Sequence, residues 1–172
     1  MNRRQADVLV IGYGNLGRLD DGLGPALASA LEKLNLPGVA VETAYQLSVE
    51  DAATIAQYPV VIFADAAVKG PAPFSFQRVK PKKGKGFTSH RMTPEALLFL
   101  ARDLFQAKTR GYSLAMRGYE FDAFGERLSE RARANLSAAL TFIKEVLVKK
   151  TFPKAAVQLR SRNSRPNFQR GN

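Results

Sequence analysis

Short apolar runs, each long enough for one strand, alternate along the chain with stretches of helical periodicity. The segments 7–12 and 60–65 are continuous apolar runs that end in Gly12 and Asp65, and such runs are typical of strands buried on both faces of a sheet. Further candidate strands lie at residues 39–41, at 112–116 and, as an edge strand, at 74–79.

Between these strands, leucines recur at helical spacing and the segments begin with residues that cap helices. Ser48, Thr93 and Ser129 are suited to the N-cap position, and Pro94 follows its cap at the first helical position. The pattern predicts helices over 23–34, 49–57, 94–107 and 130–147. Strands that alternate with helices in this way predict an α/β fold, a three-layer sandwich of a mostly parallel twisted sheet with helices on both faces.

Length and composition agree with a single globular domain. The chain has 172 residues, of which 45% are hydrophobic and 24% charged, which is the balance of a folded protein rather than a disordered one. The helical pattern ends before residue 150, so we predict a domain over 1–150 and a basic, disordered tail over 151–172. The sequence contains no cysteine, which excludes a thiol nucleophile and thiolate metal ligands. Neither a membrane-spanning run nor a signal peptide is recognisable, so we expect a cytoplasmic protein.

The positive charge is concentrated in two segments. The net charge is +11, but the loop 69–91 and the tail 149–172 together hold 14 basic residues and no acidic one. The rest of the chain has 12 basic and 15 acidic residues, a net charge of −3. Basic segments of this kind bind phosphate backbones, yet neither segment has the interleaved aromatic residues of a nucleic-acid stacking surface. We therefore treat nucleic-acid binding as a minor alternative and solvated surface as the default.

Candidate chemistry gathers where the predicted strands end. In an open parallel sheet, ligands bind at the carboxyl ends of the strands. Asp20 and Asp21 follow the first strand, Asp65 ends the third, and His90, which is the single histidine, precedes a helix. Each of these residues alone is better explained by a structural role: a helix cap for Asp20 or Asp21, a cap or loop contact for Asp65 and a surface position for His90. Carboxylates and an imidazole at one sheet edge are, however, the donors that nickel, zinc or a similar divalent ion prefers.

The same loop also matches a dinucleotide-binding fingerprint. Gly12, Gly14 and Gly17 have the GxGxxG spacing, and Glu42 after the second strand is placed to bind a ribose. This makes a Rossmann-like nucleotide-binding regulatory module the alternative function. The acidic pair Asp20 and Asp21 argues against it, because two carboxylates at the start of the helix repel a pyrophosphate.

The segment 12–25, GYGNLGRLDDGLGP, closely resembles the opening motif of the nickel–iron hydrogenase maturation endopeptidases. The resemblance continues in order through residues 60–66, 89–95, 118–121 and 128–129, and it covers about residues 7–148. The tail lies outside it. The resemblance implies a protease that removes a C-terminal extension from the precursor of a hydrogenase large subunit after nickel has been inserted.

The resemblance also implies which residues form the site. Matched by position, the nickel-recognising ligands are Asp21, Asp65 and His90, and relatives often have a glutamate where this chain has the shorter Asp21. Asp20 is a candidate for a general-base or orienting role. The implied partner is the large-subunit precursor, with nickel presented by that substrate rather than held by the free enzyme. We expect a monomer, which cleaves by metal- or carboxylate-assisted hydrolysis and has no role at a membrane.

Overall fold

The computed structural model describes residues 6–84 and 92–158. Each predicted strand and helix is present, but the strands predicted at 39–41, 60–65 and 112–116 are two or three residues longer, and the helix predicted at 49–57 is only five residues long. A 3₁₀ helix at 19–22 and a short strand at 157–158 were not predicted. The strands are β1 (Val8–Tyr13), β2 (Val39–Ala44), β3 (Val60–Ala67), β4 (Phe74–Val79), β5 (Arg110–Arg117) and β6 (Val157–Gln158). The helices are the 3₁₀ helix η1 (Leu19–Gly22) and the α-helices α1 (Leu23–Leu34), α2 (Asp51–Ile55), α3 (Pro94–Phe105) and α4 (Glu130–Lys149).

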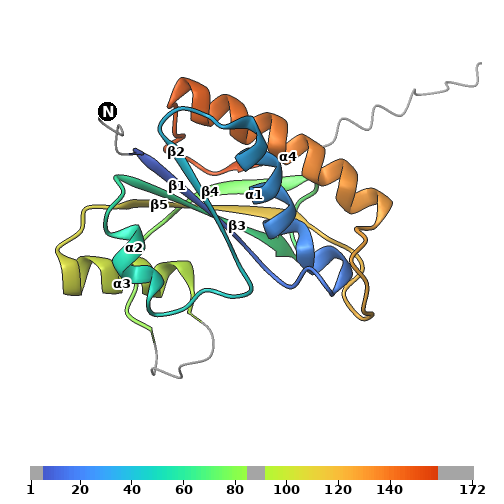
Figure 1. Cartoon of the computed structure of the whole chain (residues 1–172), viewed down its shortest axis with the longest axis horizontal. Coiled ribbons are helices and arrows are strands. Elements are labelled where there is room, and N and C mark those ends of the chain that lie inside the picture. The colour runs from blue at the N-terminus through green and yellow to red at the C-terminus, as the bar shows by residue number, and fades with distance from the viewer. Residues whose placement is uncertain (1–5, 85–91, 159–172) are drawn as a thin grey trace, which may run out of the picture.

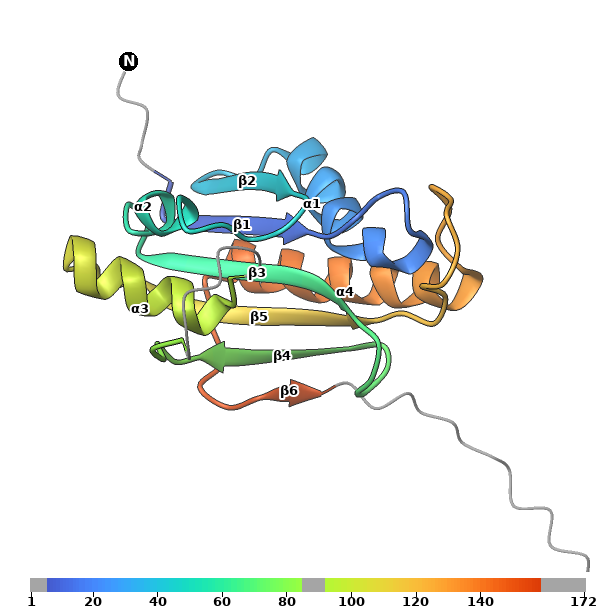
Figure 2. The ribbon, with the colours of Figure 1, turned by 90° about the horizontal axis from the view of Figure 1, so that it is seen from below.

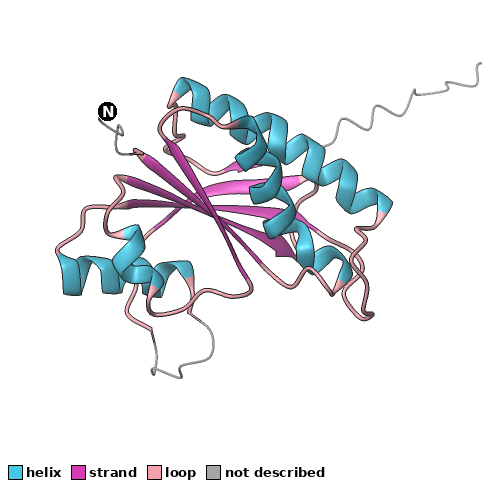
Figure 3. Ribbon diagram, in the orientation of Figure 1, coloured by secondary structure: helices cyan, strands magenta, loops and turns pink. Residues whose placement is uncertain are grey.

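The described strands form one sheet in the order β2-β1-β3-β5-β4-β6. Neighbours from β2 to β5 are parallel, whereas β4 runs antiparallel to both β5 and β6 (Figure 2). Helices α1 and α4 cover one face of the sheet, and α2 and α3 cover the other (Figures 1 and 3). The predicted three-layer α/β fold with a mostly parallel sheet is therefore confirmed. β4 is not an edge strand, because β6 pairs with its outer side.

The caps that the sequence predicted start the two long later helices. The Thr93 hydroxyl accepts a hydrogen bond from the N–H of Ala96, and the Ser129 hydroxyl accepts one from Ala132. β1 and the first half of β3 are buried on both faces, as their continuous apolar runs predicted. The apolar side chains of each strand thus serve two separate cores, one under α1 and α4 and one under α2 and α3.

Helix α1 lies unusually close to the sheet because two glycines face each other. A Cβ on Gly24 would lie less than 3 Å from the carbonyl oxygens of Tyr13 and Ala64, and one on Gly12 would meet Gly24 and Ala28 at similar range. Real Cβ atoms do not approach backbone this closely, so both positions require glycine. The close contact brings the loop before α1 onto the ends of β1 and β3.

We therefore expect Gly24→Ala to destabilise the fold by about 2–4 kcal/mol, because the added methyl group overpacks a backbone contact that cannot move aside. Denaturant unfolding measures the loss. Gly84→Ala is the control, since among the described residues its Cβ would meet only the Ala96 methyl, at 3.8 Å, and its stability is expected to stay within about 0.5 kcal/mol of wild type. Equal stability of the two variants would contradict the role assigned to Gly24.

The chain continues to pack on the sheet beyond the domain boundary predicted at residue 150. The Phe152 ring lies 5.2 Å from that of Tyr112, and Val157 pairs with Phe76 in β4. Lys150 Nζ also contacts an Asp7 carboxylate oxygen at 2.6 Å. Residues 151–158 thus belong with the domain, and only the part of the predicted tail from residue 159 lies outside the described structure.

A chain that ends at Lys150 is expected to lose about 2 kcal/mol of stability, because the aromatic contact of Phe152 and the β6 pairing are removed. A chain that ends at Gln158 keeps both and is expected to unfold like the full chain. Thermal unfolding of the two truncated chains beside the full one measures the difference. Identical unfolding of all three would show that residues 151–158 add nothing to the fold.

Candidate functional site

The parallel strands end at one edge of the sheet, and a pocket of about 320 Å³ opens there. It contains both Asp21 and Asp65, so the structure brings together two of the residues that the sequence singled out. The loop after β2 and the start of α3 complete its wall. The lining residues are Tyr13, Gly14, Arg18, Asp21, Tyr45, Gln46, Leu47, Asp65, Met92, Thr93 and Pro94.

Asp65 lies near the end of β3, on the face that α2 and α3 cover. Its Oδ1 accepts a hydrogen bond of 2.7 Å from the N–H of Ala66. Burial raises the pKa of the Asp65 carboxyl to about 6, and the nearby charge of Asp21 adds to this, while hydrogen bonds from Ala66 and Tyr13 act in the opposite direction. A carboxyl with this pKa exchanges its proton close to neutral pH, which suits acid–base work.

Tyr13 is a site residue that the sequence reasoning missed. Gly12 of β1 lies opposite Ala64 of β3, so the next residues, Tyr13 and Asp65, are neighbours on the same face. Burial raises the pKa of the Tyr13 hydroxyl well above its usual range, and the charge of Asp65 and its hydrogen bond add to the effect. The phenol therefore stays protonated and donates toward Asp65. The sequence did contain a signal for this residue, because Tyr13 follows the apolar run of the first strand just as Asp65 follows that of the third.

Asp21 reaches the pocket from η1. The backbone N–H of Asn15 donates to Asp21 Oδ2 at 2.9 Å, and the Asn15 side chain in turn accepts a hydrogen bond of 2.8 Å from Gly17. Gly14 allows this close loop, since it has a φ of 142° and a Cβ there would collide with the Asp21 carbonyl oxygen. The asparagine of the loop thus fixes the carboxylate that follows it six residues later.

Asp20 has a different role from its neighbour, and a general-base function does not fit its surroundings. It is fully buried and lies outside the pocket lining. Its two oxygens accept hydrogen bonds from the N–H groups of Tyr119, Glu120 and Ser129 and from the Ser129 hydroxyl. Burial raises the pKa of the Asp20 carboxyl, but these donors outweigh it and hold the pKa below its usual range. Asp20 thus ties η1 to the segment before α4.

His90, the third expected ligand, lies outside the described residues. Within residues 6–84 and 92–158, no group of three or more histidine and acidic side chains is close enough to hold a metal ion. The described site therefore offers two carboxylates, and the start of α3, which follows His90 in the chain, forms part of the same pocket wall.

The backbone N–H groups of the glycine loop are almost all hydrogen-bonded within the protein, which leaves few for a pyrophosphate. Every backbone N–H from Gly14 to Asp21, except that of Leu16, donates to a protein oxygen. A dinucleotide-binding turn instead presents unpaired N–H groups at the start of its helix. The structure thus uses Gly12 and Gly14 for close packing, and it argues against the nucleotide-binding alternative.

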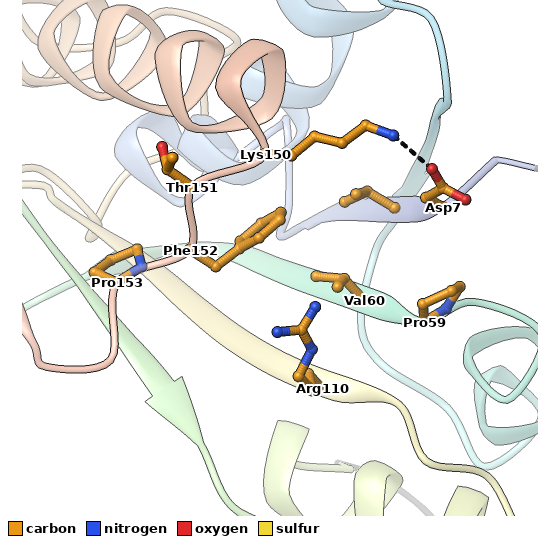
Figure 4. Close-up of a pocket in the computed structure, with 9 residues that line it drawn as sticks. Asp7, Pro59, Val60, Arg110, Lys150, Thr151, Phe152 and Pro153 are labelled. Carbon is orange, nitrogen blue, oxygen red and sulfur yellow. Dashed lines mark hydrogen bonds and ion pairs between the residues drawn. The ribbon is translucent and has the colours of Figure 1, made fainter.

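A larger cavity, of about 740 Å³, lies at the opposite edge of the sheet, where β1, β3 and β5 begin. Figure 4 shows Arg110 and Phe152 on its walls and the ion pair between Lys150 and Asp7 at its side. None of the predicted site residues lines it. Because ligand crevices of open α/β sheets lie at the carboxyl ends of the strands, the smaller pocket is the candidate site.

In the part of the chain that the structure describes, no helix is both long and apolar enough to cross a lipid bilayer.

Several solved structures of hydrogenase maturation enzymes have a similar fold. The [NiFe] hydrogenase maturation protease HycI from Thermococcus kodakarensis is 20% identical with a TM-score of 0.65, covering 84% of this chain and 94% of that one. A hydrogenase 2 maturation peptidase from a Thaumarchaeota archaeon is 24% identical with a TM-score of 0.60, and the match covers 81% of this chain and 97% of that one. The hydrogenase maturating endopeptidase HybD from E. coli is 19% identical with a TM-score of 0.61, and the match covers 88% of this chain and 96% of that one.

No protein-family model and no curated protein matches the sequence. The likeness therefore rests on the three-dimensional structure, and it spans nearly the whole length of each of these enzymes. The chain has the fold of the hydrogenase maturation proteases.

Proposed function

We propose that this protein is an endopeptidase that removes a C-terminal extension from the nickel-loaded precursor of a nickel–iron hydrogenase large subunit. The observation that carries the proposal is the meeting of Asp21 and Asp65 in one pocket, on a fold shared with enzymes of that activity. The motif resemblance, which was recognised in the sequence independently of the fold, supports the same conclusion.

In this proposal, Asp21, Asp65 and His90 contact nickel that the precursor already holds. Nickel is thus a feature of the substrate, which the two carboxylates recognise before cleavage. Carboxylate and imidazole donors match this ion, and the fixed loop around Asn15 sets the position of Asp21. A precursor without nickel lacks the cation that offsets two nearby negative charges, so it binds poorly.

Cleavage of a peptide bond by water requires a group that accepts and returns protons. Asp65, with a pKa of about 6, is suited to this at neutral pH, and the protonated Tyr13 hydroxyl orients it. Asp65 must be ionised both to contact nickel and to accept a proton. Loss of this carboxylate therefore removes either function. We also propose that the reaction takes place in the cytoplasm and that the protein acts as a monomer.

An in vitro processing assay tests the proposal. The purified protein is mixed with nickel-loaded and nickel-free large-subunit precursor, and mass spectrometry reads the C-terminus of each. Cleavage of the nickel-loaded form alone is expected. If a correctly loaded precursor stays intact, the protein is not the protease, and a thermal-shift screen with nickel, NAD and nucleotides becomes the next step.

His90→Ala is expected to abolish processing, because the sequence contains no other imidazole. Unfolding of the variant, measured beside wild type, separates a loss of activity from a loss of the folded state. The processing assay with the nickel-loaded precursor measures the loss. Wild-type cleavage by His90→Ala would remove this residue from the site.

A further inference from the structure

A second, smaller hollow adjoins the candidate site on the same edge of the sheet. It has a volume of about 280 Å³, and it shares Gly14 and Tyr45 with the pocket that holds Asp21 and Asp65. Its other lining residues are Asn15, Leu16, Pro25, Thr43 and Ala44. The two hollows are therefore neighbours, with Gly14 and Tyr45 contributing to both.

The walls of this hollow expose apolar surface that folding leaves uncovered. Leu16 is 57% exposed and Tyr45 is 68% exposed, although both are large hydrophobic residues. The Asn15 side-chain amide donates to the Tyr45 hydroxyl at 3.2 Å, which restrains the position of the ring. Large apolar side chains that stay exposed and are held in place beside a candidate site indicate a binding surface.

The hollow and the carboxylates are positioned by the same loop. Gly14 donates its N–H to the carbonyl of Ala44, and Asn15 donates to Asp21, so Leu16 follows two anchored residues. Leu16 has the one amide between Gly14 and Asp21 that donates to no oxygen of the described residues. The distance from the apolar hollow to Asp21 is thus set by the fold rather than by a ligand.

The edge of the sheet beside the hollow suits an extended polypeptide. Strand β2, which supplies Thr43 and Ala44, pairs only with β1 among the described strands. Its outer edge therefore carries backbone N–H and C=O groups that an added extended segment can pair with. A polypeptide laid along this edge presents its side chains to the hollow and its next residues to the carboxylates.

We propose that the hollow formed by Leu16, Pro25 and Tyr45 binds an apolar side chain of the precursor, within a few residues of the scissile bond. The inference rests on the proposed function and deepens it by assigning a specificity subsite. The substrate then makes two separate contacts, one through its nickel with the carboxylates and one through an aliphatic or aromatic side chain with the hollow.

The test compares Leu16→Ser with Leu104→Ser in the processing assay. Leu104 is 61% exposed on α3 and lies outside both hollows, so it is a matched control for the loss of an exposed leucine. Leu16→Ser is expected to lower kcat/KM about tenfold or more, mainly through KM, whereas Leu104→Ser stays within about twofold of wild type. Tyr45→Ser removes the ring from the hollow and should resemble Leu16→Ser.

Substitutions in the precursor supply the second arm. Apolar residues near its cleavage site are changed one at a time to serine, and each change is combined with Leu16→Ser. At the residue that enters the hollow, the loss seen with wild-type enzyme should largely disappear with Leu16→Ser, because the contact is already gone. Wild-type kcat/KM for both Leu16→Ser and Tyr45→Ser, or losses that multiply independently at every precursor position, would overturn the subsite.

A binding measurement tests the subsite separately from the proposed proteolysis. Binding of the uncleaved precursor is measured for wild type and for Leu16→Ser. A precursor that binds only wild type, without cleavage by either protein, would overturn the proposed protease and retain the binding surface. Equal binding by both proteins would overturn the surface, and so would a failure of wild type to bind.

Discussion

Asp20→Asn is expected to lower the stability of the protein, whereas Asp21→Asn, at the adjacent residue, is expected to lower its activity. Asp20→Asn should lower the free energy of unfolding by about 2–4 kcal/mol, because an amide cannot accept from all four donors around this buried position. Asp21→Asn should stay within about 1 kcal/mol of wild type, since its amide oxygen can still accept the Asn15 N–H. Its processing rate should fall at least about 100-fold.

Denaturant unfolding and the processing assay separate these two roles. The Asp20 carboxyl has a lowered pKa, so its ionised form contributes stability above its usual pKa of 3.8, and this stability is lost as the pH falls further. The stability difference between wild type and Asp20→Asn is therefore expected to shrink in acid. An Asp20→Asn protein that is fully stable but inactive would reverse the assignment and return Asp20 to the catalytic group.

Asp65→Asn is expected to make the protein more stable and inactive. Burial raises the pKa of this carboxyl from 3.8 to about 6, so the fold disfavours the ionised form. Between these two pH values the native state holds a proton that the unfolded chain has released, and stability falls as the pH rises. Above pH 6 the full cost, about 3 kcal/mol at most, is present in wild type and missing in the variant.

Unfolding curves at a series of pH values check this prediction. At pH 8, Asp65→Asn is expected to exceed wild type by about 1–3 kcal/mol, and near pH 3.5 the gain should vanish because both forms are then uncharged. Processing of the nickel-loaded precursor should fall at least about 100-fold. Parallel stability curves for the two proteins would show that the fold does not raise the pKa of Asp65. A variant that is more stable but inactive is the result expected when a carboxylate serves function at a cost in stability.

Much of the fold could be predicted from local patterns in the sequence. The continuous apolar runs of β1 and β3, the leucine spacing of α1 and the caps at Thr93 and Ser129 are each contained within a few neighbouring residues. Alternation of strands and helices then determined the parallel sheet, because a helical crossover returns the chain so that the next strand runs in the same direction. The meeting of Asp21 and Asp65 at one edge followed from the same rule. Asp20 could not be told from Asp21 in this way.

Tertiary structure decided what depends on partners far away in the chain. Asp20 became a structural residue because its donors come from Tyr119, Glu120 and Ser129, about 100 residues later. Residues 151–158 carry no strong sequence pattern of their own. They are positioned by the contact of Phe152 with Tyr112 and by the pairing of β6 with β4. The sequence by itself determined which elements form and at which edge the chemistry gathers. Which of two neighbouring carboxylates faces the pocket was decided by contacts between distant segments, because burial and hydrogen-bond donors are properties of the assembled fold.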